Sequence, residues 1–421
     1  MMTKNQINER EQLEILTIEQ LVPANHLVRK LDAAIDFSFI YPLVENLYSQ
    51  FGRPSIDPVV LFKMTMIQYV FGIRSMRQTI KEIETNVAYR WFLGFGFHTE
   101  VPHFSTFGKN YVRRFENTDV FEQIFYCILK EIVEEGLLSA DHIFIDSTHV
   151  KASANKRKFD KKMVRKETRA YEAKLQEELN IDREKNGKKP FPKEKFEREE
   201  FKEIKESTTD PESGYYVKDE RTKQFAYSFH AATDERGFVL GTIVTPGNIH
   251  DSHILQPLVE KVIEKVKKPL AVAADAAYKT PAITNFLLEN QMLPVLPYTR
   301  PKTKDGFFRK HDYVYDEHND CYICPNDQML PYVTTTKEGY RQFKSNPTIC
   351  ANCPFLQQCT ESKNHTKLIQ RHIWEAYVEE AEHLRHHEEI KLIYAKRKET
   401  IERVFAAMNL KKLATWTWQG A

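Results

Sequence analysis

Two aspartates that follow short apolar runs are the residues of this chain best suited to chemistry. Asp146 ends the run Ile143–Ile145, and Asp275 ends the run Leu270–Ala274. Such runs predict buried strands, and open α/β sheets carry their chemistry at the carboxyl ends of strands. Two carboxylates on neighbouring strand ends can converge on a divalent cation, because hard cations prefer oxygen ligands. The sequence therefore predicts a cation site at one edge of a sheet.

A third carboxylate is expected from a later helix, because metal-assisted chemistry on phosphodiesters needs more than two ligands. The chain is predicted to be helical from about residue 373, and Glu402 lies there downstream of Tyr394 and Arg397. Glu399 competes with Glu402 for this role. Taken alone, a glutamate in such a helix is more typical of a solvent-facing position.

Five of the six cysteines lie between residues 321 and 359, which favours a metal site over a disulfide framework. The spacing of Cys324, Cys350, Cys353 and Cys359 fits a tetrahedral, structural zinc site in a small knuckle with no core of its own. Cys321 is an alternative ligand to Cys324. Reduced thiols in a loop region are the competing interpretation.

Residues 1–130 are predicted to be helical. Ser75 and Gln78 form a capping-box pattern, and Asn86 interrupts the following periodicity, which allows a helix-turn-helix. A further helix is expected from Ser105 and carries Arg113 and Arg114. An ordinary bundle with solvated basic residues and a helical DNA-binding domain are equally compatible with this pattern.

Residues 140–300 alternate between strands and helices and predict a mixed α/β core. Two strands, 224–233 and 237–245, are joined by a turn, and helices are expected at 252–266 and 280–289. His250 and Asp251 precede the first of these helices and fit either a cap or a role in orienting a ligand. The element order is typical of a ribonuclease-H-like mixed sheet. A charged, helix-prone insertion without a core occupies 151–215, a cysteine-rich insertion 301–370, and a C-terminal helical part 371–421.

The charge of the chain is distributed unevenly. The formal net charge is only +2, but residues 151–174 carry ten Lys or Arg against three acidic residues, with Lys151, Lys156 and Arg157 at the start. This excess suits phosphate better than a membrane. No apolar run is long enough to span a bilayer, and the polar N-terminus argues against a secretory signal. We therefore expect a cytoplasmic protein.

Several motifs, taken in order, resemble the DDE transposases of bacterial insertion sequences, in the branch with a helical N-terminal domain. The resemblance covers nearly the whole chain and is carried by order and spacing rather than by one motif. The motifs are Phe51-Gly52-Arg53-Pro54-Ser55, Val101-Pro102-His103-Phe104-Ser105-Thr106-Phe107, Ile145-Asp146-Ser147-Thr148, Thr245-Pro246-Gly247-Asn248-Ile249-His250-Asp251 and Ala274-Asp275-Ala276-Ala277-Tyr278.

The resemblance implies roles for individual residues. Asp146, Asp275 and Glu402 would bind Mg²⁺ or Mn²⁺, with two ions in the active site, and Tyr394 and Arg397 would hold the scissile phosphate. The implied partners are the element ends and target DNA, and joining two ends implies a homodimer at the nucleoid. The last motif departs from the family, because one extra residue separates Arg397 from Glu402 and the expected lysine is Asn409.

This departure implies that a segment of the catalytic core is missing after Phe405. Three functions are therefore compatible with the sequence: an active transposase, a DNA-binding relic that occupies element ends without cutting, and a metal-dependent nuclease without strand transfer. Cleavage of a labelled element end in Mg²⁺ would separate them.

Overall fold

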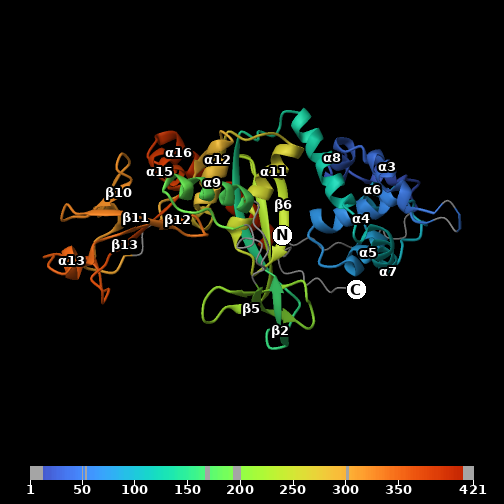
Figure 1. The fold of residues 1–421 in the computed structure, drawn as a ribbon. Coiled ribbons are helices and arrows are strands. Elements are labelled where there is room, and N and C mark those ends of the chain that lie inside the picture. Colours follow the sequence, from blue (N-terminus) through green and yellow to red (C-terminus); the bar gives the residue numbers. More distant parts are fainter. Residues whose placement is uncertain are drawn as a thin grey trace, which may run out of the picture. The chain divides into compact units, whose positions relative to one another are not determined.

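The structure is a computed structural model, and it describes residues 13–49, 51–52, 55–165, 171–192, 201–299 and 303–410. The chain divides into two compact units, with the boundary between Glu134 and Glu135. Each unit is described by itself below (Figure 1).

The N-terminal unit is helical in its described residues, as the apolar periodicity predicts. Asp57 caps α4 and Pro58 opens it, Ser75 caps α5, and Asn86 ends α5 and caps α6, so the predicted break at Asn86 is confirmed. The helices are α1 (Ile18–Leu21), α2 (Leu27–Ala34), α3 (Ile40–Val44), α4 (Pro58–Val70), α5 (Met76–Thr85), α6 (Val87–Phe92), α7 (Phe104–Asn110) and α8 (Val120–Glu134).

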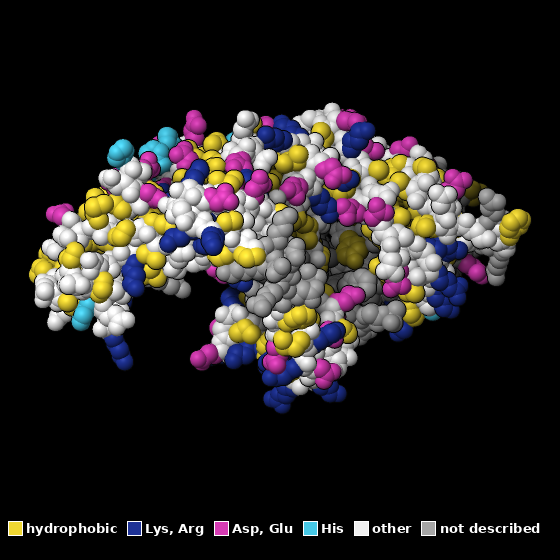
Figure 2. Space-filling model, in the orientation of Figure 1, with side chains coloured by type: hydrophobic (Ala, Val, Ile, Leu, Met, Phe, Trp, Pro, Cys, Tyr) yellow, Lys and Arg dark blue, Asp and Glu magenta, His cyan; other side chains and the backbone are white. Residues whose placement is uncertain are grey.

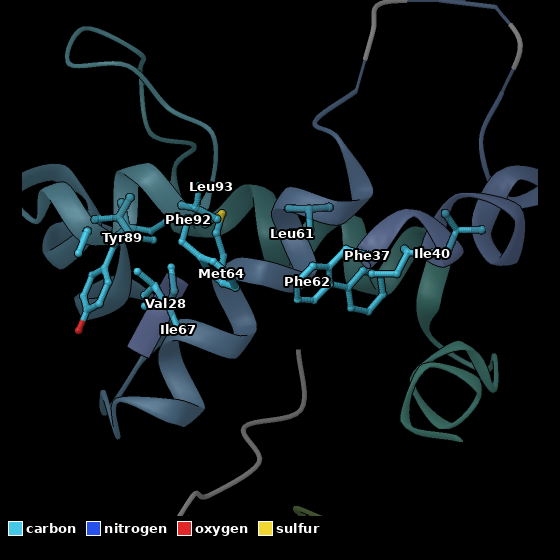
Figure 3. Close-up of a cluster of buried hydrophobic side chains, with 14 of the residues drawn as sticks. Val28, Phe37, Ile40, Leu61, Phe62, Met64, Ile67, Tyr89, Phe92 and Leu93 are labelled. Carbon is cyan, nitrogen blue, oxygen red and sulfur yellow. The ribbon is translucent and has the colours of Figure 1, made fainter. Parts of the chain in front are cut away.

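The core of this unit is built around α4. Leu61, Met64 and Ile67 are almost fully buried and pack with Val28 and Phe92 of neighbouring helices (Figure 3). The helix expected from Ser105 is present as α7, which begins one residue earlier, and the ring of His103 caps it by accepting the backbone N–H of Ser105.

The C-terminal unit contains a mixed sheet that supplies the site. Its strands are β1 (His142–Lys151), β2 (Phe159–Arg165), β3 (Phe201–Ser207), β4 (Gly214–Val217), β5 (Lys223–Thr233), β6 (Val239–Pro246), β7 (Ala271–Ala273) and β8 (Leu293–Val295). The order is β2-β3-β4-β5-β1-β7-β8, and β6 also pairs with β5. β1 is parallel to β7, and β7 is parallel to β8, whereas β1 and β5 are antiparallel.

Helices cover both faces of the central strands. On one face, Ile143 and Val272 pack against Leu258 of α11 (Leu255–Lys265) and Leu287 of α12 (Pro281–Glu289). On the other, Phe144 packs against α16 (Glu388–Ala395) and α17 (Ile401–Leu410), which follow α15 (Glu375–Leu384). The predicted hairpin 224–245 is present as β5 and β6, and the mixed α and β fold class is confirmed.

The charged segment 151–215 departs from the predicted helical insertion. α9 (Glu172–Lys185) is helical, but β2 and β3 form an antiparallel ladder. Lys and Glu favour helix, yet here they pair across strands: Lys161 lies 3.0 Å from Glu203, and Lys162 lies 2.9 Å from Glu206. Tertiary pairing therefore overrides local propensity.

The cysteine-bearing segment forms a second, antiparallel sheet. Its strands, in the order β13-β12-β11-β10-β9, are β9 (Val314–Asp316), β10 (Cys321–Ile323), β11 (Met329–Thr335), β12 (Tyr340–Lys344) and β13 (Leu368–His372). Short helices α13 (Pro347–Cys350) and α14 (Leu356–Cys359) connect β12 to β13. The prediction of a knuckle without a core is wrong, because Tyr322, Leu330 and Phe343 are buried together.

None of the helices in the described ranges is long and apolar enough to cross a membrane.

Candidate active site

The register of two parallel strands brings Asp146 and Asp275 to the same level of the sheet. Phe144 of β1 pairs with Ala273 of β7. Asp146 comes two residues after Phe144, and Asp275 comes two residues after Ala273. Side chains two residues apart on a strand point to the same face. Asp146 is therefore on the face of Phe144, which α17 covers.

Asp146 is not at the end of its strand, which corrects the sequence interpretation. β1 continues to Lys151 because it stays paired with β5 after its partner β7 has ended. The apolar run ends at Ile145 because burial between two helical layers ends there, not because the strand does. Asp275 does lie just past a strand, where it accepts the N–H of Ala277 at 2.9 Å and caps a short 3₁₀ turn.

Asp146 is largely buried and has one ion-pair partner, Arg397. Nη2 of Arg397 lies 2.7 Å from Oδ2 of Asp146, and Arg397 as a whole residue is 7% exposed. Burial raises the pKa of the Asp146 carboxyl, Arg397 opposes that rise, and the negative charges of Asp275 and Asp251 add to it. The site therefore concentrates more negative charge than Arg397 compensates.

We expect Arg397→Met to lower the free energy of unfolding at pH 7 by on the order of 3 kcal/mol, because it leaves a buried carboxylate without its partner. Without Arg397 the folded-state pKa of Asp146 rises further above its unfolded value. The loss is therefore full above the pKa of Asp146 in the folded variant, and it disappears as the pH falls below the pKa of Asp146 in the folded unchanged protein, because the unfolded state is the same in both. Urea denaturation across this pH range measures it. Arg403→Met, an exposed arginine of α17, is the matched control and should have little effect.

The sequence was compatible with two roles for Asp251, a helix cap or the orientation of a ligand. The residue that caps the turn after β6 is His250, whose Nδ1 accepts the N–H of Ser252. Asp251 lies near Asp146, and its Oδ1 is 3.8 Å from Nδ1 of the buried His230. Burial lowers the pKa of His230, so this ring is neutral at neutral pH and leaves the Asp251 charge uncompensated.

Glu402 and Tyr394 lie on elements that pack on the Asp146 face. Ile401 and Phe405 of α17 are buried against Phe144, which leaves Glu402 exposed on the same helix. The ring centroid of Tyr394 lies 5.7 Å from the guanidinium of Arg397. Glu402 is not among the charges that perturb Asp146.

Asp146 and Asp275 fit one edge of a divalent-cation site. Both supply carboxylate oxygens. Burial is the main cause of the raised pKa of Asp146, and the charges of Asp275 and Asp251 add a repulsion that a cation would relieve. In the described ranges, no three His, Cys, Asp or Glu residues are already grouped closely enough to hold an ion.

The basic residues proposed for DNA contact differ in their surroundings. Lys151, Lys156 and Arg157 are exposed at the end of β1 and in the turn before β2. Figure 2 shows Lys and Arg side chains at the bottom of the view, where Figure 1 labels β2. Arg113 is exposed in a π-helical turn. Arg114 hydrogen-bonds Asn110 and covers the ring of Tyr48, so it is engaged within its own unit.

Two of the predicted zinc ligands, Cys324 and Cys350, lie near a third, Cys359. Burial raises the pKa of the Cys359 thiol, and the nearby Cys350 and Cys324 raise it further. Cys353 follows on the same turn as Cys350. Cys321 is instead buried in β10, where burial and then Asp316 and Asp320 raise its pKa.

Two protein-family models match the chain. Residues 16–113 match a family described as transposase domain (DUF772), and residues 323–420 match the transposase DDE domain. The first match lies in the helical unit, and the second includes Arg397 and Glu402. No curated protein and no solved structure matches this chain. Together with the order of the sequence motifs, the two matches identify the chain as an insertion-sequence transposase of the DDE type, which acts on DNA in transposition.

Proposed function

We propose that the C-terminal unit cleaves DNA at the ends of its element and transfers the freed ends to target DNA, with Asp146, Asp275 and Glu402 as the metal-binding residues. The observation that carries the proposal is the register of β1 and β7. It sets the two aspartates at one level, beneath the helix that carries Glu402. The part β6-β5-β1-β7-β8 of the sheet supports a ribonuclease-H-like core, since its first three strands are antiparallel and its last three parallel.

The residues of this site fit hydrolysis followed by transesterification. Bound Mg²⁺ or Mn²⁺, two ions in the active complex, would activate the attacking oxygen and neutralise the leaving one. Water would attack the phosphorus and the P–O3′ bond would break. One proton of the water would pass, through solvent, to the leaving 3′ oxygen to give a 3′-OH, and the other would be released from the new 5′ phosphate. That 3′-OH would then attack a target phosphodiester, which exchanges one P–O bond for another. Arg397 and Tyr394 would hold the scissile phosphate by charge-assisted hydrogen bonds.

The test is cleavage of a labelled duplex that carries the element end, with full-length protein and Mg²⁺. We expect a nick at the element boundary that requires the metal and joined product when target DNA is added. Cleavage without joining would support a nuclease and refute strand transfer. Because two ends must be joined, we expect the active complex to contain a homodimer, which light scattering with bound DNA measures.

A DNA-binding relic is the second candidate, and the segment after Phe405 favours it. Asn409 stands where the family motif has a lysine, and the resemblance implies that part of the core is missing there. Residues 411–421 lie outside the described residues, so this interpretation stays a prediction. Salt-sensitive binding of the element end with no nicking at any Mg²⁺ concentration would favour the relic.

We also propose structural zinc at Cys324, Cys350, Cys353 and Cys359. Burial and the neighbouring Cys350 and Cys324 raise the pKa of the Cys359 thiol, a cation would stabilise its thiolate, and four thiolates would close the coordination sphere of Zn²⁺.

We expect purified protein to contain one zinc per chain and Cys350→Ser to lose most of it, because removal of one thiolate opens the tetrahedral site. Elemental analysis measures the content. Cys321→Ser is the matched control, since this thiol is buried in β10, where Asp316 and Asp320 and not the other cysteines raise its pKa, and it should keep the zinc. Full zinc content in Cys350→Ser would contradict the assignment.

A further inference from the structure

Asp275 is positioned by the turn that follows β7, because β7 itself ends two residues earlier, at Ala273. The residues that close this turn are firmly anchored. Tyr278 is fully buried and packs with Ile283 of α12. The side chain of Lys279, which ends the turn, is only 7% exposed. A lysine buried to this extent costs free energy unless its ammonium is paired, so the partners of Lys279 indicate what this residue holds in place.

The ammonium of Lys279 joins three segments of the C-terminal unit. It forms an ion pair with Glu382, near the end of α15, and it donates a hydrogen bond to the carbonyl oxygen of Pro297 at 3.3 Å. Pro297 belongs to the loop that follows β8. Because β7 and β8 are parallel, the loops that follow them leave the same edge of the sheet. Lys279 therefore ties the turn of Asp275 to the neighbouring loop and to α15.

α15 is itself fixed to the elements around this turn. The hydroxyl of Tyr377, near the start of α15, donates to Glu289 of α12 at 3.2 Å. At the other end, Glu382 also pairs with Arg385, whose guanidinium lies 4.7 Å from the ring centroid of Tyr298. Tyr298 belongs to the same loop after β8. The carboxylate that receives Lys279 is thus held on both sides, and it can act as a fixed support for the turn.

The charge of Lys279 and its contacts predict opposite effects on a cation at Asp275. Four residues separate the two, so their Cα atoms are at most about 14 Å apart. An ammonium repels a cation, and if charge were its only effect, its removal would strengthen metal binding. Groups that hold a metal ligand in place act in the other direction, because their loss typically weakens metal binding by about 10- to 100-fold. The sign of the change therefore separates the two roles.

We infer that Lys279 is a positioning residue of the metal site, which acts through Glu382 and the Pro297 carbonyl to hold the turn on which Asp275 is presented. The inference rests on the proposed function, because that function places a cation between Asp146 and Asp275. Strand pairing brings the two segments to one level, and the Lys279 contacts hold the last residues of the turn. Lys279 itself touches neither the cation nor DNA in this role.

The test measures metal binding without DNA cleavage. Full-length protein is titrated with Mn²⁺, and the free ion is recorded by electron paramagnetic resonance. Asp275→Ala should lose a Mn²⁺ site, which identifies the site to be followed. We expect Lys279→Met, which keeps the apolar stem and removes the ammonium, to raise the dissociation constant of that site about tenfold. Lys279→Arg keeps the charge and the donors, and it should bind Mn²⁺ more tightly than Lys279→Met. Glu382→Gln added to Lys279→Met should change little, because the contact is already lost.

The matched control is Lys391→Met, which removes an exposed lysine of α16 that pairs with Glu388 and should leave Mn²⁺ binding unchanged. Circular-dichroism melting confirms that each variant is folded at the temperature of the titration. Equal or tighter Mn²⁺ binding by folded Lys279→Met, with the site lost in Asp275→Ala, overturns the positioning role and leaves the proposed function standing. If the unchanged protein has no Mn²⁺ site that depends on Asp275, both are overturned.

Discussion

Asp146→Asn is expected to reduce DNA cleavage by about 1000-fold or more while DNA binding is retained. The carboxylate is proposed to hold a cation that contributes several kcal/mol to transition-state stabilisation, and each 1.4 kcal/mol corresponds to a factor of ten. The variant loses the charge that pairs with the buried Arg397, but asparagine keeps a side-chain oxygen that can accept from the guanidinium, so we expect a lower melting temperature in a protein that still folds. Single-turnover nicking of a labelled element end measures the rate, and a gel-shift assay measures binding.

The matched control for this prediction is Asp160→Asn, an exposed aspartate of β2, which should cleave at the unchanged rate. Asp275→Asn and Asp275→Ala add a second comparison, because Asp275 also caps a turn. Both should lose cleavage. Asparagine caps as well as aspartate, so only the alanine variant should also lose about 1 kcal/mol of stability. Cleavage that survives Asp146→Asn would remove this residue from the metal site.

Glu402→Gln is expected to reduce cleavage by about 100-fold with no change in melting temperature. The proposed role of Glu402 is that of the third metal-binding carboxylate, and removal of one stabilising group in a preorganised site costs about this factor. The melting temperature should not change because Glu402 is exposed, and the buried face of its helix is made by Ile401 and Phe405. Nicking at saturating Mg²⁺ and Mn²⁺ is the measurement.

Glu399→Gln is the matched control for Glu402→Gln, because it removes an equally exposed glutamate three residues earlier. It should cleave as the unchanged protein does. If the Glu399 variant were the inactive one, Glu399 and not Glu402 would be the third carboxylate. If Asp251→Asn were inactive and Glu402→Gln active, the third carboxylate would be Asp251, whose charge acts on Asp146.

Local patterns were sufficient for the helical unit and for the hairpin of β5 and β6. Asn86 both ends one helix and caps the next, and this can be read from the side chain alone. The strands β2 and β3 could not be predicted in this way. Their lysines and glutamates favour helix, and only the partner strand decides that they pair as Lys161 with Glu203. The same reasoning missed the aromatic core of the second sheet, whose members are spread from Tyr313 to Ile369.

The sequence by itself determined which residues of this transposase could bind a cation, because the ability to bind one depends on residue type and spacing: carboxylates that follow apolar runs, and thiols at short intervals. The tertiary structure decided which of them meet. Parallel pairing of β1 with β7 sets Asp146 and Asp275 at one level, and the turn after β6 adds Asp251. Packing of α16 and α17 on Phe144 brings Arg397 to Asp146. These contacts join segments far apart in the chain, and their register depends on pairing and burial that no local pattern encodes.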